Sequence, residues 1–118
     1  MGGDAGDGYF IKPTAFESLP EDSRVVKEEV FGPVVVINTF KAEAEAIAKA
    51  NDNEHGLYVA IFTKDLDRAV RVSKLLQAGA VGVNYANPNF ARDMPYGGYK
   101  MKDIGRREEM NSLNYFLG

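Results

Sequence analysis

The stretch that decides the fold is VAIFTKDLDRAVRVSKLLQAGAVGVN, residues 59–84. It begins with an apolar, β-prone run at residues 59–63 and ends with another at residues 80–84. Between them, Asp65 can cap the amino end of a helix, and Gly79 can end it in a left-handed conformation. Helical spacing relates the residues Leu66, Ala69, Val70, Ser73 and Leu76. Strand, helix and strand with short connections predict a right-handed crossover between parallel strands.

The sequence before this stretch predicts the same alternation. Residues 34–40 are apolar on both faces, which is typical of a buried strand. Residues 41–51 are rich in alanine and straight-chain charged residues, which favours a helix. In the turn that follows, Gly56 can adopt a left-handed conformation. We therefore expect an α/β fold: a partial parallel sheet built from βαβ crossovers, with helices packed on it.

The beginning of the chain carries weaker patterns. Residues 1–8, MGGDAGDG, predict a flexible loop, so we expect the domain to span residues 9–118. Residues 9–16 predict an edge strand or an extended arm, because Pro13 cannot donate to a strand ladder. Residues 18–23 predict a turn.

The composition excludes several classes of function. The 118 residues carry 14 basic and 17 acidic side chains, a net charge of −3, with no Lys/Arg cluster typical of a nucleic-acid surface. The absence of cysteine excludes a thiolate nucleophile, a disulfide and Cys-ligated metal within these residues. The single histidine, His55, offers no His pair for a metal. No apolar run is long enough to span a membrane, so we expect a soluble protein, cytoplasmic by default.

Two groups of residues could bind a ligand. In Glu28-Glu29-Val30-Phe31-Gly32-Pro33, a carboxylate could accept hydrogen bonds from ribose while Phe31 packs on a flat ring, but the spacing alone favours a structural turn. Gly97 and Gly98 could cradle a phosphate, but their spacing fits no phosphate loop and favours a tight turn with close backbone packing. His55, among turn residues, is expected to be a surface side chain rather than a catalytic one.

A third candidate is the polar and aromatic loop at residues 85–95, which leaves the carboxyl end of the strand at residues 80–84. Open α/β sheets bind their ligands at that edge. We therefore expect function to concentrate in this loop, which runs on to the PYGGYK stretch at residues 95–100.

Several short motifs follow one another along the chain: GYFIKPT (8–14), EEVFGPV (28–34), FTKDLDRA (62–69), QAG (77–79), PYGGYK (95–100) and IGR (104–106). Together they resemble the C-terminal part of the catalytic domain of NAD(P)-dependent aldehyde dehydrogenases. The resemblance runs from about residue 2 to residue 113. Each motif is weak by itself, but their common order and spacing make chance similarity implausible.

The resemblance implies that the catalytic residues of the family lie outside this segment. In the family a cysteine thiolate attacks the aldehyde, a glutamate acts as general base and an asparagine helps to hold the oxyanion, all before the segment matched here. The family reaction forms a thiohemiacetal, passes hydride to the nicotinamide and hydrolyses a thioester. The resemblance therefore implies no catalytic residue and no metal in this chain. It implies NAD or NADP in the intact enzyme, with no tight binding to this chain alone.

Four residues match binding positions of the family. Glu29 matches the glutamate that hydrogen-bonds the nicotinamide-side ribose, and Phe31 matches the aromatic residue beside the nicotinamide. Phe90 and Tyr96 are similar to aromatic residues that line the substrate tunnel. One departure is that the usual Tyr-Gly-Leu-Ala stands here as HGLY, residues 55–58.

The sequence leaves two main hypotheses of different classes. The first is a C-terminal fragment of an aldehyde dehydrogenase, inactive by itself, whose partner is the rest of the enzyme. The second is a stand-alone binding or interaction module derived from the same fold, which would self-associate through exposed apolar faces. A minimal nucleotide binder using Glu29 and Phe31 is a weaker third, because the phosphate and adenine sites of the family lie elsewhere.

Overall fold

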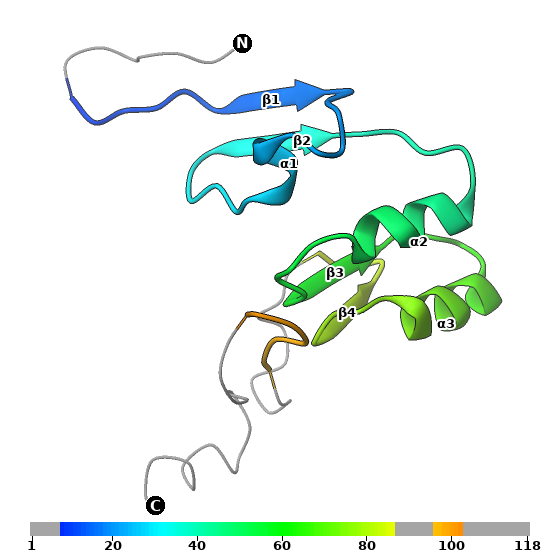
Figure 1. Ribbon diagram of the computed structural model, residues 1–118. Helices are drawn as coiled ribbons and strands as arrows, with labels where there is room; N and C mark the ends of the chain where they lie inside the picture. Colours follow the sequence, from blue (N-terminus) through cyan, green and yellow to red (C-terminus); the bar gives the residue numbers. More distant parts are fainter. Residues whose placement is uncertain (1–7, 87–95, 103–118) are drawn as a thin grey trace, which may run out of the picture. The chain divides into compact units, whose positions relative to one another are not determined.

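The computed structural model describes residues 8–86 and 96–102. In chain order they form β1 (Thr14–Glu17), α1 (Arg24–Lys27), β2 (Val34–Ile37), α2 (Glu43–Asn51), β3 (Tyr58–Ile61), α3 (Leu66–Leu75) and β4 (Ala80–Val83) (Figure 1). Backbone contacts group the chain into two compact units, Met1–Glu45 and Ala46–Gly118. Both units contain parallel strands connected through a helix, which confirms the α/β fold.

The first unit is built on the parallel pair β1 and β2. Thr14 lies opposite Val34, and Glu17 lies opposite Ile37. β1 occupies the end of the region predicted as an edge strand. The connecting helix α1 was not predicted, because its four residues are too few to show a helical period.

β2 is less enclosed than its sequence predicts. Side chains that are apolar on both faces predict a strand covered on both sides. In the structure Val35 and Ile37 are 53% and 52% exposed, while Val34 and Val36 are half-buried. The prediction of burial on both faces was therefore wrong for the described part of the chain, which covers only one face of this strand.

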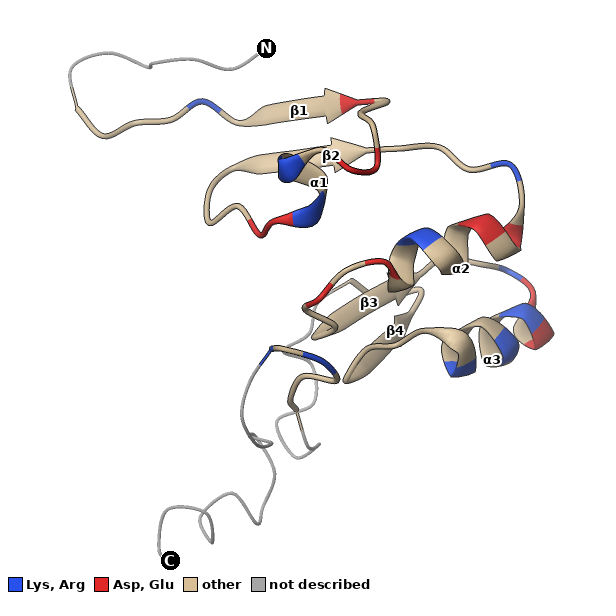
Figure 2. Cartoon of the chain, in the orientation of Figure 1, with Lys and Arg blue, Asp and Glu red and all other residues tan. Residues whose placement is uncertain are grey.

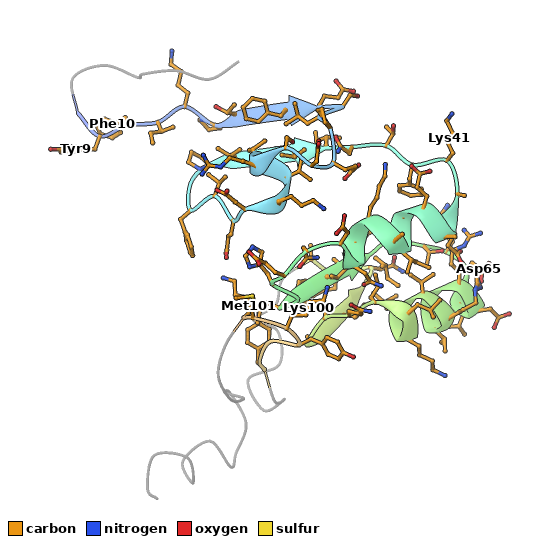
Figure 3. All side chains as sticks on the ribbon, in the orientation of Figure 1. Tyr9, Phe10, Lys41, Asp65, Lys100 and Met101 are labelled. Atoms are coloured by element: carbon orange, nitrogen blue, oxygen red, sulfur yellow. The ribbon has the colours of Figure 1, made fainter. Side chains whose placement is uncertain are left out.

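The second unit contains the crossover predicted from residues 59–84. β3 and β4 pair in parallel, and α3 connects them (Figure 1). Asp65 caps α3 as predicted, since its Oδ1 accepts a hydrogen bond of 2.9 Å from the Arg68 N–H (Figure 3). This bond holds the pKa of the Asp65 carboxyl below its ordinary value.

The hydrogen bonds divide these strands into two sheets, β1 with β2 and β3 with β4. The sequence predicts one parallel sheet through residues 34–40, 59–63 and 80–84. Local patterns specify that a segment is extended but do not choose its neighbour, and the boundary between the two units falls within α2. Each parallel pair therefore lies within one unit.

The buried apolar side chains of the described residues lie along α3. Ala69 is 4% exposed, and Val72 and Leu76 are 9% exposed. Their spacing places them on one stripe of the helix, which contacts β4. Val70, predicted to share that stripe, is 47% exposed. The exposed part of α3 carries charged side chains together with the apolar side chains of Leu66, Val70 and Leu75 (Figure 2).

The carboxyl end of α3 is held by a side chain of the preceding helix rather than by a glycine cap. Asn51 Nδ2 donates to the Leu75 carbonyl at 2.9 Å, and Asn51 Oδ1 accepts from the Gln77 N–H at 2.8 Å. The predicted role of Gly79 as a left-handed cap was wrong, because its φ is not positive. Instead, a Cβ at Gly79 would overlap the carbonyl oxygen of Gly97, so the glycine permits a close approach of two backbone segments.

Asparagine side chains also join the carboxyl ends of both strand pairs. Asn84, after β4, accepts from the Thr63 N–H at 2.8 Å and donates to the Thr63 carbonyl at 2.9 Å. Asn38, after β2, makes the same two bonds with Leu19, each 3.0 Å long. A primary amide has the donor and the acceptor of a peptide group. Each side chain therefore acts as one more rung of its strand pair.

Lys100 fastens the segment at residues 96–102 to the carboxyl end of α2. Its Nζ donates to the carbonyl oxygens of Asn51 and Asn53, at 2.6 and 2.7 Å (Figure 3). The last carbonyls of a helix lack intrahelical partners and carry the negative end of its dipole, so a cation stabilises them. The Tyr99 N–H, which donates to the Gly56 carbonyl at 3.0 Å, adds a backbone contact.

We predict that Asn84→Gly exposes the Thr63 amide. Glycine keeps the φ of 54° that Asn84 adopts but removes the amide. A lost hydrogen bond of about 1 kcal/mol gives a roughly fivefold faster hydrogen exchange at Thr63. Hydrogen exchange at Thr63 should be faster still in Asn84→Ala, because a positive φ is unfavourable for alanine. Unchanged protection of Thr63 in Asn84→Gly would show that the amide does not hold these strand ends.

We predict that Lys100→Met loosens residues 96–102. Methionine keeps the apolar stem, but the two carbonyls at the end of α2 lose a charged donor, a loss of about 1–3 kcal/mol. Hydrogen exchange of the Tyr99 and Met101 amides should accelerate at least fivefold. The control is Lys74→Met, a change at an exposed lysine of α3. Equal exchange in the two variants would contradict the prediction.

Candidate functional site

The segment that carries Glu29 and Phe31 is a bend between α1 and β2. The Gly32 N–H donates to the Val30 carbonyl at 2.9 Å, and the Val34 N–H donates to the Gly32 carbonyl at 2.8 Å. Two such bonds in succession make the chain turn tightly just before β2. The bend favoured by the sequence is confirmed. Glu29 is exposed, and the Phe31 ring is 91% exposed.

The first of the two neighbouring carboxylates in this segment makes an ion pair on its own helix. Glu28 accepts two hydrogen bonds from Arg24, from Nε to Oε1 at 2.8 Å and from Nη2 to Oε2 at 2.9 Å. These bonds hold the pKa of the Glu28 carboxyl below its ordinary value. In Figure 2 the basic residues of α1 lie beside the acidic start of the bend. Both carboxylate oxygens of Glu28 therefore bind Arg24, on the same helix.

A hollow of about 370 Å³ lies at the amino ends of β1 and β2. It is lined by the backbone and mostly apolar side chains of two segments, Pro13, Thr14 and Ala15 with Gly32, Pro33, Val34 and Val35. The hollow adjoins the bend along the chain, because Gly32 follows Phe31 directly. The structure therefore brings a carboxylate, an exposed aromatic ring and an apolar hollow to the segment that enters β2.

Tyr96 belongs to the second unit and is half-buried. The segment at residues 96–102 runs beside the turn before β3, since the N–H groups of Tyr99, Met101 and Lys102 donate to the carbonyls of Gly56, Glu54 and His55. Figure 1 shows this orange segment at the tails of the β3 and β4 arrows. The sequence placed function at the carboxyl ends of these strands, whereas residues 96–102 lie at their amino ends. Phe90 lies outside the described residues.

Gly97 and Gly98 pack closely, as the sequence favoured. Gly97 is buried against Gly79, and a Cβ at Gly98 would overlap the carbonyl oxygen of Lys102. His55, by contrast, is not the surface side chain that was predicted. It is half-buried, and its Nε2 is buried with no hydrogen-bond partner in the described part of the chain.

Tyr58, the last residue of the HGLY stretch at 55–58, fits against a glycine of the neighbouring strand. Its hydroxyl donates to the Tyr85 carbonyl at 2.8 Å, and a Cβ at Gly82 would overlap both groups. The larger side chain at position 58 thus fits because position 82 is glycine. Sequence reasoning missed this pair, although a glycine inside a strand is a known signal of close approach.

The described residues offer no metal centre and no membrane span. Among residues 8–86 and 96–102, no three His, Asp or Glu side chains are grouped to hold a metal ion. No helix in these two ranges is long and apolar enough to cross a membrane. The Glu29–Phe31 bend with its adjoining hollow is the candidate ligand-binding feature of the first unit.

Comparison with known sequences identifies the family. The model of the aldehyde dehydrogenase family matches residues 1–118. An aldehyde dehydrogenase of Enchytraeus buchholzi is 47% identical over 110 residues, which are 93% of this chain and 22% of the relative. The chloroplastic betaine aldehyde dehydrogenase of Beta vulgaris is 50% identical over 99 residues, 84% of this chain and 20% of the relative. The chain thus spans about a fifth of the length of these relatives.

Solved structures give the same result. Betaine aldehyde dehydrogenase from Staphylococcus aureus, in complex with NAD⁺, is 42% identical with a TM-score of 0.87, and the match covers 97% of this chain and 23% of that one. Aldehyde dehydrogenase 21 from Physcomitrella patens, in complex with succinate, is 34% identical with a TM-score of 0.86, and it covers 97% of this chain and 24% of that one. The chain belongs to the aldehyde dehydrogenase family.

Proposed function

We propose that the chain is the C-terminal part of the catalytic domain of an aldehyde dehydrogenase, whose intact form oxidises aldehydes to carboxylic acids with NAD⁺ or NADP⁺. The order of the motifs supports this position within the family. The chain also spans only about a fifth of its relatives. The observation that carries the proposal is the match of the family model to residues 1–118, which include the EEVFGPV motif at residues 28–34.

In this proposal the Glu29–Phe31 bend meets the nicotinamide end of the cofactor. The residues fit that group, because a carboxylate can accept hydrogen bonds from ribose hydroxyls and an exposed ring can pack against a flat heterocycle. Bound nicotinamide supplies the hydride acceptor. Glu29 orients the ribose, and Phe31 excludes water from one side of the ring. Tyr96 and Phe90 would line the path of the aldehyde.

The same residues do not form a complete dinucleotide site. No glycine-rich phosphate loop of recognised spacing occurs in the sequence. The bend by itself would contact only part of the cofactor, and a partial contact binds weakly because association loses translational and rotational freedom. The phosphate and adenine sites, and the cysteine, would come from other parts of the polypeptide.

We predict that the purified 118-residue chain reduces no NAD⁺ or NADP⁺ with any aldehyde. Without a thiolate, the covalent step of the family cannot begin. NADH absorbance with a panel of aliphatic, aromatic and charged aldehydes checks this, and the intact polypeptide serves as the positive control. Turnover by the short chain that survives repurification would contradict the proposal.

A second candidate function is a stand-alone interaction module. The observation that favours it is the exposure of large apolar side chains before β1 and in the bend: Tyr9, Phe10, Ile11 and Phe31 are all at least 69% exposed. Figure 3 labels Tyr9 and Phe10. Exposed apolar surface promotes association with a partner or with a second copy. A stable monomer in light scattering that also binds no apolar dye would count against this alternative.

We predict that Glu29→Gln in the intact enzyme weakens the cofactor about tenfold, because a hydrogen bond to a charged acceptor contributes more than one to a neutral amide. The KM for NAD⁺ should rise while the KM for the aldehyde stays constant. The matched control is Glu17→Gln, a change at an exposed carboxylate at the end of β1. An unchanged KM for NAD⁺ in Glu29→Gln would remove Glu29 from the cofactor site.

A further inference from the structure

Helix α1 is a single turn that leads into the Glu29–Phe31 bend. It contains four residues, and the Ser23 side chain does not cap it, since its Oγ donates to the Pro20 carbonyl at 2.6 Å instead. A single helical turn is unstable in water unless other contacts fix it. Main-chain bonds do close the turn, among them the Glu28 N–H to the Arg24 carbonyl at 2.7 Å. Its ends therefore need a further connection.

Arg24 and Glu28 supply that connection. They are the first residue of the helix and the residue that ends it, and their side chains meet through two parallel hydrogen bonds of 2.8 and 2.9 Å. A two-point contact between a guanidinium and a carboxylate fixes relative orientation as well as distance. A lysine in place of Arg24 would keep the charge but not this geometry.

The pair also separates the roles of two adjacent carboxylates. Glu28 and Glu29 are neighbours in the chain, and either could in principle face a ribose. Arg24 donates to both oxygens of Glu28 and draws that side chain back along α1. This contact lies at the end of α1, and Glu29 is the next residue in the chain.

We propose that Arg24 is a positioning residue for cofactor binding: its two-point contact with Glu28 fixes the end of α1 and so orients Glu29 and Phe31 toward the nicotinamide ribose. This inference rests on the proposed function of the bend. Arg24 itself touches no cofactor. Its side chain is 87% exposed and that of Glu28 is 55% exposed, so the effect is expected to be modest.

The test uses the intact enzyme with four variants: Arg24→Met, Arg24→Lys, Glu28→Gln and the charge swap Arg24→Glu with Glu28→Arg. Equilibrium affinity for NADH, from its fluorescence, is measured beside the steady-state constants. We expect each single variant to lower the affinity for NADH and to raise the KM for NAD⁺, each about two- to fivefold. The kcat and the KM for the aldehyde should stay unchanged. Arg24→Lys should resemble Arg24→Met, and the charge swap should restore most of the affinity.

Two controls give each outcome a meaning. Arg71→Met, at an exposed arginine of α3, should leave NADH affinity unchanged, and melting temperatures identify any variant that is simply unfolded. If Glu29→Gln weakens NADH but the Arg24 and Glu28 variants do not, the inference is overturned and the proposed function stands. If Glu29→Gln has no effect, the proposed cofactor contact fails and the inference fails with it.

Discussion

Asparagine amides that take the place of backbone peptides hold the described structure together. Asn38 and Asn84 close the carboxyl ends of the two strand pairs, and Asn51 joins the end of α2 to the end of α3. Each of these side chains both donates and accepts a hydrogen bond. It therefore satisfies main-chain groups at the ends of strands and helices, where no partner within the element is left. Short strands of four residues need this help, because a two-stranded pair is marginally stable by itself.

The strand pairs depend on these asparagine side chains because the described residues bury little apolar surface. Among the described residues, the buried apolar side chains are those along α3, whereas Phe10, Phe31 and Ile37 are more than half exposed. The sequence of β2 is that of a strand covered on both faces, although one face lies open. A chain that carries the residues of a larger core but buries few of them fits a piece of a larger domain. The cofactor site is incomplete in the same way as the core, because the bend would supply only one of the several contacts that a dinucleotide needs.

Local chemistry could be read from the sequence, and long-range contacts could not. The cap at Asp65 and the left-handed Gly56 were predictable, because each depends on residues within one turn. The role of Gly79 was mistaken because its constraint is Gly97, eighteen positions away on a different segment. The bend at Glu29 and Phe31 was predictable from its Gly-Pro sequence. The Arg24–Glu28 contact is also local, but the four residues of α1 show no helical period that would have revealed it. The Tyr58–Gly82 fit and the place of residues 96–102 depend on tertiary packing.

The central claim is that this chain works as part of a longer polypeptide, which contributes the thiolate and most of the cofactor site. The most direct test is the intact mass of the native protein, captured from its source with an antibody against this chain. We expect a species several times heavier than the 13.0 kDa of these 118 residues, with a cysteine in its additional sequence. A stable native species of 13.0 kDa, with no heavier form, would contradict the proposed function and favour a stand-alone interaction module.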